Sequence, residues 1–238
     1  MLRRRAFGDA DRILVVLTRD HGKLSVLAKG LRRARARNAA GMDLLARSRL
    51  QLIPGRSLAV LAQARPLGAS LSGADPVRLA CASVLAELVD ATVEEGHPEP
   101  RVYEILAEAS TRIGVVAADP RLALSLAAFA LAAAGGYQPE LTTCVACGRE
   151  LENRDGTFVA ALGGVVQGEC QARAPGLPCG AATLRVLRRM AVADEATVLR
   201  LRWQPSLRDE VQAILIAHLE HHLDRPIRAA RVLVELSS

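Results

Sequence analysis

Four cysteines between residues 144 and 179 form the pattern that carries the clearest chemistry in this chain. Cys144 and Cys147 lie in CVACG, a turn in which two thiolates can face one ion while the glycine relieves the backbone. Cys170 and Cys179 follow in QGECQARAPGLPC. Because four thiolates complete a tetrahedral site, the sequence predicts a structural zinc ion held by all four cysteines.

The second cysteine pair is irregular, which leaves two alternatives open. Gln167 stands at the position where a regular zinc ribbon would have its third cysteine. The alternatives are a degenerate site that has lost its metal and a redox pair formed by Cys144 and Cys147. The fifth cysteine, Cys81, lies among leucine and valine residues and is expected in the core.

The first third of the chain has a strong positive charge. Residues 29–37 read KGLRRARAR, and residues 1–72 hold 15 basic against 4 acidic side chains, a net charge of +11. Residues 73–238 have a net charge of −5, so we expect an anion-binding module joined to an acidic body. Arginine and lysine neutralise phosphates without reading base sequence. The residues expected to contact DNA are Arg3, Arg4, Arg5, Lys23, Lys29, Arg32, Arg33, Arg35, Arg37, Arg47 and Arg49.

Such basic side chains can also form a solvated loop or meet an anionic lipid surface, and these are the alternatives. Residues 1–72 contain a single aromatic residue, Phe7, so few bases could stack on a ring there. We therefore expect nucleic-acid binding that depends on charge, weakens steeply with salt and discriminates little between bases.

Motifs of enzymes are weak in this sequence. His97-Pro98-Glu99, followed by Cys144 and Cys147, resembles part of a zinc deaminase signature, but Thr143 replaces the expected proline. The helical spacing of His218 and His222 suits two metal ligands, yet no third ligand is evident nearby. Neither a phosphate-binding loop nor a nucleophile elbow occurs. We expect no enzyme. The alternatives are a zinc-containing nucleic-acid-binding regulator and, with less support, a zinc-dependent deaminase.

Two parts of the chain must position these residues. Strands at 12–18, 24–29, 44–53 and 57–64 predict a small β-barrel or sandwich, with Gly22 in the turn between the first two. From residue 75 the apolar period becomes helical, and helices are predicted at 77–95, 101–116, 121–135, 181–192, 207–223 and 227–236. The predicted fold class is α+β. A small β module at 1–72 precedes an all-α domain at 73–238, which contains a zinc-finger-like insert at 140–180.

The location expected from the sequence is the cytoplasm, without contact to a membrane. No apolar run follows the basic start, as a secretory signal would require. The most apolar stretch, residues 122–136, ends in glycines and is shorter than the ~20 residues that span a bilayer.

DRILVVLTRDHGKLSVLAKGLRR (11–33) resembles the opening of the bacterial DNA repair protein RecO family. The order of parts is also similar, with Gly163-Gly164 ahead of the second cysteine pair and HLEHHLDRPIRAARVL (218–233) near the end. The resemblance covers nearly the whole chain. Two departures from the family are expected: zinc-bearing relatives usually carry a cysteine where this chain has Gln167, and residues 2–5 resemble the end of the family's first strand, whose beginning would lie ahead of Leu2.

The resemblance implies a recombination mediator associated with the nucleoid, built from an OB-fold and a helical domain that often holds zinc. It implies binding to single- and double-stranded DNA and annealing of complementary strands. The implied protein partners are RecR, the acidic C-terminal tail of single-strand binding protein and, indirectly, RecA, which the family helps to load. For the acidic tail, the expected contacts are Arg185, Arg188 and Arg189.

Overall fold

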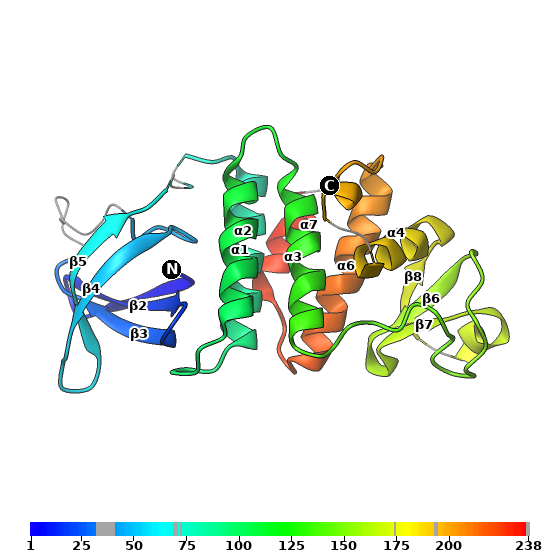
Figure 1. Cartoon of the computed structure of the whole chain (residues 1–238), viewed down its shortest axis with the longest axis horizontal. Coiled ribbons are helices and arrows are strands. Elements are labelled where there is room, and N and C mark those ends of the chain that lie inside the picture. The colour runs from blue at the N-terminus through cyan, green and yellow to red at the C-terminus, as the bar shows by residue number, and fades with distance from the viewer. Residues whose placement is uncertain (32–40, 69–70, 72, 174, 193–194, 237–238) are drawn as a thin grey trace. The chain divides into compact units, whose positions relative to one another are not determined.

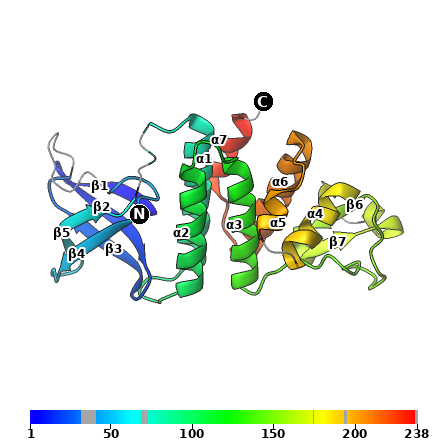
Figure 2. The ribbon, with the colours of Figure 1, turned by 45° about the horizontal axis from the view of Figure 1, so that its top comes forward.

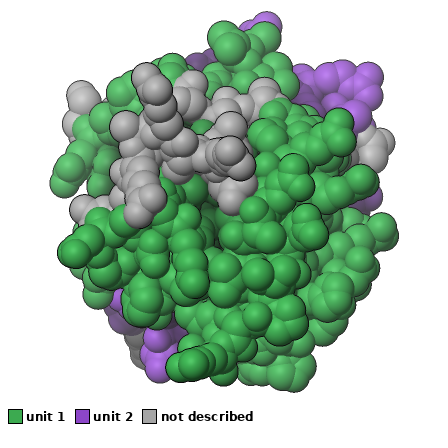
Figure 3. All heavy atoms as spheres, turned by 90° about the vertical axis from the view of Figure 1, so that its left-hand side faces the viewer, with its two compact units in different colours: residues 1–120, 228–238 green, residues 121–227 purple. Residues whose placement is uncertain are grey.

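The structure is a computed structural model that describes residues 1–31, 41–68, 71, 73–173, 175–192 and 195–236 (Figure 1). It divides into two compact units. Unit 1 comprises residues 1–120 and 228–238, and unit 2 comprises residues 121–227 (Figure 3). The domain boundary expected near residue 72 lies inside unit 1, and the division into 1–72 and 73–238 stays a prediction.

Unit 1 begins with a five-stranded sheet in the order β1-β2-β3-β5-β4 (Figures 1 and 2). Its strands are β1 (Arg3–Phe7), β2 (Asp11–Thr18), β3 (Gly22–Ala28), β4 (Ser48–Ile53) and β5 (Ala59–Pro66). Neighbouring strands are antiparallel except for β3 and β5. Among the described residues no ladder joins the edge strands β1 and β4, so the sheet is not closed. Five strands in a partly open arrangement are typical of an OB-fold.

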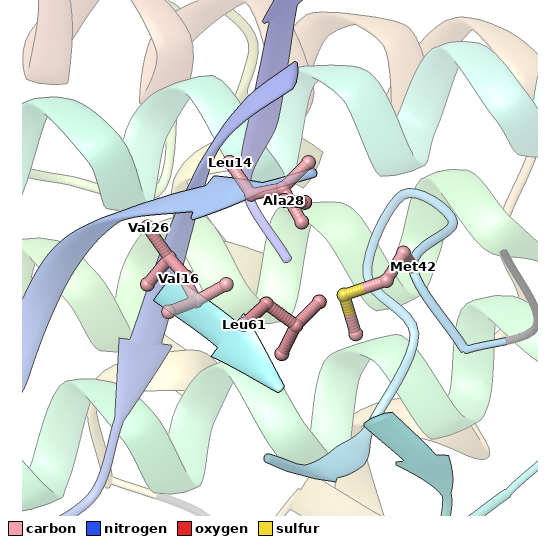
Figure 4. Close-up of a cluster of buried hydrophobic side chains, with 6 residues drawn as sticks. All are labelled: Leu14, Val16, Val26, Ala28, Met42 and Leu61. Atoms are coloured by element: carbon pink, nitrogen blue, oxygen red, sulfur yellow. The ribbon is translucent and has the colours of Figure 1, made fainter. Parts of the chain in front are cut away.

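The core of this sheet forms because strand side chains two residues apart point to the same face. Figure 4 shows the buried cluster formed by Leu14, Val16, Val26, Ala28, Met42 and Leu61. Met42 comes from the segment ahead of β4, not from a strand. There Leu45 has a positive φ of 55°, and the strand expected at 44–53 begins only at Ser48 because this turn precedes it.

The β2–β3 hairpin has the turn that the sequence predicts. Gly22 has a φ of 67°, and the Thr18 hydroxyl donates to its carbonyl oxygen at 3.0 Å. A Cβ atom at Gly22 would lie 2.1 Å from the carbonyl oxygen of His97. Glycine is therefore required twice, for its backbone conformation and for the close approach of the segment after α1.

Three helices complete unit 1, namely α1 (Pro76–Thr92), α2 (Pro100–Gly114) and α7 (Arg228–Glu235). The expected N-cap is present, because the Asp75 carboxylate accepts from the Arg78 backbone N–H at 2.9 Å and Pro76 occupies the first turn. α7 packs against α1, and the Ala229 N–H donates to the Glu87 carboxylate at 2.9 Å. Segments far apart in the sequence thus form one unit.

Unit 2 contains α3 (Pro120–Ala134), α4 (Ala181–Val192), α5 (Glu195–Leu199) and α6 (Pro205–His222), except that Pro120 itself is counted in unit 1. Between α3 and α4 lies a small sheet in the order β7-β6-β8, made of β6 (Gly156–Val159), β7 (Gly164–Val166) and β8 (Leu177–Cys179). The short helical turns are η1 (Ala160–Leu162) and η2 (Gly168–Arg173). The α+β class is confirmed, with a sheet followed by a mainly helical region. In the described part of the chain, no helix has both the length and the apolar character to cross a bilayer.

Candidate nucleic-acid interface and metal centre

Three of the four predicted metal ligands come together. The sulfur atoms of Cys144, Cys147 and Cys170 lie within 4.8 Å of one another. The first two belong to a tight turn in which the Gly148 N–H donates to the Cys144 carbonyl oxygen at 2.8 Å and Gly148 has a φ of 73°. Cys170 is supplied by η2. Three thiolates this close could hold a soft metal ion.

The electrostatics of this group favour a thiolate at Cys147, whose hydrogen bond with Cys170 raises the pKa of the Cys170 thiol. The Arg149 guanidinium donates to the Cys147 sulfur at 3.4 Å and lowers the pKa of that thiol to about 6. The lowered pKa favours the ionised form of Cys147, which is the form in which cysteine binds metal. The donor set fits zinc in the chemistry of its three sulfur atoms.

The structure does not bring Cys179 into this group, which departs from the predicted set of four. Cys179 ends β8, where it pairs with Gly156 and is buried. Burial, with the nearby carboxylates of Glu210 and Asp155, raises the pKa of this thiol to about 12. A thiol that resists ionisation in a strand of the core packs as a small apolar residue.

Gln167 does not replace the missing cysteine as a ligand. It is buried, and its side-chain amide donates to the carbonyl oxygens of Glu152 at 3.0 Å and Arg154 at 2.8 Å. Its carbonyl oxygen accepts from the Glu152 N–H at 3.0 Å. This side chain thus fastens the 152–154 segment to β7, and among the described residues the three cysteines have no fourth cysteine beside them.

Arg3 and Lys23, two of the predicted DNA contacts, form ion pairs with a carboxylate of the protein itself. The Asp90 carboxylate on α1 is buried and pairs with Lys23 at 3.2 Å and with Arg3 at 2.9 Å. The Lys23 ammonium also donates to the Asp90 carbonyl oxygen at 2.5 Å. Only 15% of the Lys23 side chain is exposed, whereas 58% of Arg3 remains accessible. Lys23 is therefore a structural link between β3 and α1.

The other predicted contacts within the described residues have exposed side chains. These are Arg4 and Arg5 on β1, Lys29 after β3, Arg47 ahead of β4 and Arg49 on β4. No carboxylate of the described residues forms an ion pair with any of them. Arg32, Arg33, Arg35 and Arg37 lie outside the residues that the structure describes.

The register of β4 and β5 reveals a further basic residue. Arg49 lies directly opposite Arg65, and Gln51 lies directly opposite Gln63, with all four side chains exposed. Like charges placed opposite each other destabilise a sheet, and a bound anion would remove that cost. The sequence predicted Arg49 but missed Arg65. Their pairing depends on a register shift after Gln51 that the alternation of residue types does not indicate.

The group of metal-ligating side chains found among the described residues contains no histidine. His218 is buried and its Nε2 lies 2.5 Å from the Tyr137 carbonyl oxygen, while Tyr137 stacks on His222 with ring centroids 4.7 Å apart. His97, the first residue of the deaminase-like motif, is exposed, and the cysteine group of the described residues includes no histidine.

Comparison with known proteins identifies the family. A model described as the recombination protein O N-terminal domain matches residues 1–69, and one described as its C-terminal domain matches residues 73–231. The chain is 32% identical to the DNA repair protein RecO of Symbiobacterium thermophilum, covering 100% of this chain and 96% of that protein. It is 35% identical to the DNA repair protein RecO of Desulforudis audaxviator, covering 98% of this chain and 93% of the relative.

The resemblance of residues 11–33 and 218–233 to this family is thereby confirmed over both parts of the chain. The relatives are named as DNA repair proteins and not as enzymes, in agreement with the expected absence of a catalytic activity. The role of this protein is in DNA repair and recombination, and the chain belongs to the RecO family.

Proposed function

We propose that this protein is a recombination mediator that binds single-stranded DNA by charge through its N-terminal module. The opposed pair Arg49 and Arg65 carries this proposal, because two exposed guanidinium groups on adjacent strands form a site for a phosphate. Arg4 and Arg5 are further exposed basic residues on β1, at the other edge of the sheet. The protein would work in the cytoplasm, at the nucleoid.

Charge neutralisation explains how such a protein would act without ATP. A strand whose phosphates are neutralised repels a second strand less, so complementary strands anneal more readily, and duplex DNA can occupy the same surface. Together with RecR, the protein would help RecA to load onto DNA coated with single-strand binding protein.

The acidic tail of single-strand binding protein is the proposed tether to coated DNA. Arg185 and Arg189 are exposed and one turn apart on α4, which suits contact with a short acidic peptide. The Arg188 guanidinium is already bonded to the carbonyl oxygens of Leu141 at 2.7 Å and Leu151 at 2.8 Å. It supports the fold of unit 2, and Arg185 and Arg189 are the better candidates for the tail.

The metal in this proposal is a structural zinc ion. Cys144, Cys147 and Cys170 would hold it, and it would fasten the CVACG turn to η2. Its function is to stabilise this part of unit 2, since a metal that binds only the folded state adds its binding energy to stability.

A salt titration of oligonucleotide binding by the full chain tests the proposal. We expect a linear fall of log affinity against log salt, with similar affinities for poly-dT and mixed sequences. Changing Arg32, Arg33, Arg35 and Arg37 to alanine should flatten this plot. Sequence-selective binding that persists at high salt would instead support a regulator.

A further inference from the structure

A shallow, open groove lies within unit 1 between α2 and two segments of the N-terminal module, the turn at Arg19 and the stretch ahead of β4 at Arg47. Its wider part has a volume of about 540 Å³ and is lined by Arg19 and Arg47 from the N-terminal module and by Tyr103 from α2. A second hollow of about 350 Å³ extends from Arg47 toward Gly68. Arg47 and Thr111 line both hollows, so they are parts of one groove. Its size is in the range of small-molecule sites and suits a nucleotide.

The charges of the groove leave one cation available. Glu104 on α2 pairs with Arg19 at 3.3 Å, and Glu108 pairs with Arg112 at 2.8 Å. Arg47 is exposed and pairs with no carboxylate of the described residues. The two carboxylates are therefore neutralised in place, and Arg47 can bind a single anionic group.

Tyr103 supplies the aromatic surface that the N-terminal module lacks. Residues 1–120 contain two aromatic side chains, Phe7 and Tyr103. Tyr103 is half-buried, and it also lines a small cavity together with Met42 and Leu106. A partly exposed ring near a guanidinium that pairs with no carboxylate of the described residues is an arrangement on which proteins stack bases of single strands.

We propose that this groove binds one nucleotide of a single strand, with its base on Tyr103 and its phosphate on Arg47. The proposal rests on the proposed function and adds a stacking site to binding by charge. An acidic peptide is the competing occupant. A groove with one free cation and two carboxylates has too little positive charge for a run of acidic residues, whereas a single phosphate needs only one cation.

Photocrosslinking of the full wild-type chain tests the location without any variant. A dT oligonucleotide that carries 5-iodouracil is bound at low salt and irradiated, and the crosslinked peptide is identified by mass spectrometry. We expect a crosslink at Tyr103. Efficient crosslinks that map only to other residues would overturn the proposal. So would loss of the Tyr103 crosslink on addition of excess poly-glutamate while the oligonucleotide stays bound, because the groove would then prefer an acidic peptide.

Affinity measurements on variants separate stacking from charge. Tyr103→Ala should weaken oligo-dT binding about tenfold and leave the salt slope unchanged, whereas Tyr103→Phe keeps the ring and should bind as the wild type does. Arg47→Ala should reduce the slope by about 0.7, the value for one phosphate contact on a single strand. Equal affinities of Tyr103→Ala and Tyr103→Phe for oligo-dT would overturn the proposed stacking site. Salt-dependent binding by both variants would in that case still support the proposed function. Loss of all oligonucleotide binding in the wild type would refute both.

Discussion

The Lys23 ammonium lies 3.2 Å from the Asp90 carboxylate, which is 4% exposed, and thereby joins the β2–β3 hairpin to α1. Arg3 binds the same carboxylate from β1 at 2.9 Å. Nearby, the Gly96 N–H donates to the Lys23 carbonyl oxygen at 2.9 Å. Removing one partner of a buried ion pair costs more than the pair contributes, because the other charge stays buried and unpaired.

The Asp90 contact predicts a difference between stability and DNA binding. Asp90→Ala should lower the free energy of unfolding by about 3 kcal/mol, measured by urea denaturation. Lys23→Met, which keeps the length of the side chain and removes its charge, should leave the salt slope of DNA binding unchanged. A lower slope for Lys23→Met would show that Lys23 contacts phosphate, as the sequence alone suggested.

Arg78 gives a second stability prediction. Its buried guanidinium donates to the carbonyl oxygens of Val115 at 2.8 Å and Val116 at 3.2 Å, and it pairs with Asp75 at 3.1 Å. The same guanidinium donates to the buried carbonyl oxygen of Ile113. Arg78→Met should destabilise the protein by about 3 kcal/mol, because this buried acceptor and the part-buried carbonyl oxygens of Val115 and Val116 lose their donor. The control is Arg101→Ala, which breaks an exposed pair with Glu104 and should cost about 0.5 kcal/mol or less. Equal effects would contradict a structural role for Arg78.

The cysteine geometry predicts which residues hold metal. Cys170→Ser should lose the bound ion, whereas Cys179→Ser should retain it. The reason is that the sulfur atom of Cys170 lies within 4.8 Å of those of Cys144 and Cys147, and Cys179 is not part of this group. Elemental analysis of the purified variants measures the content, and the thiolate-to-cobalt absorption of the cobalt-substituted protein reports the ligands. Loss of the ion in Cys179→Ser would contradict this assignment and support the four-cysteine site predicted from the sequence.

The buried histidine predicts a loss of stability in acid. Burial lowers the pKa of His218 below its usual value of 6.5, so the unfolded chain binds a proton more readily than the folded chain. The contribution of neutral His218 is complete above pH 6.5 and is lost as the pH falls below that value. Unfolding free energies at pH 7.5 and 5.5 should therefore differ more in the wild type than in His218→Gln. The control is His21→Gln, which changes a histidine in an exposed turn. If the unfolding free energy changed between the two pH values by the same amount in the wild type and in His218→Gln, the prediction would be contradicted.

Local patterns in the sequence determined much of this structure. The Gly22 turn, the Asp75 cap and the CVACG turn each depend on residues within a few positions, so their residue types suffice to predict them. The composition of residues 1–72 likewise indicates a basic module without showing which charges are free.

The remaining features depend on contacts between distant segments. Lys23 and Asp90 are far apart in the sequence, and nothing near Lys23 indicates that its charge is already paired. Cys179 has the residue type of a ligand, but its place in β8 directs it into the core. Tyr103 belongs to a helix, and Arg47 lies ahead of β4; the two line one groove only because the fold brings these distant segments together.

The central claim is that the N-terminal module binds phosphate through exposed arginines, and the opposed pair Arg49 and Arg65 tests it most directly. The slope of log affinity against log salt for oligo-dT is measured for the wild type, for Arg49→Ala/Arg65→Ala and for the uncharged neighbouring control Gln51→Ala/Gln63→Ala. Two lost phosphate contacts should reduce the slope by about 1.4, while the control keeps it. A slope that the arginine variant shares with the wild type would contradict the account.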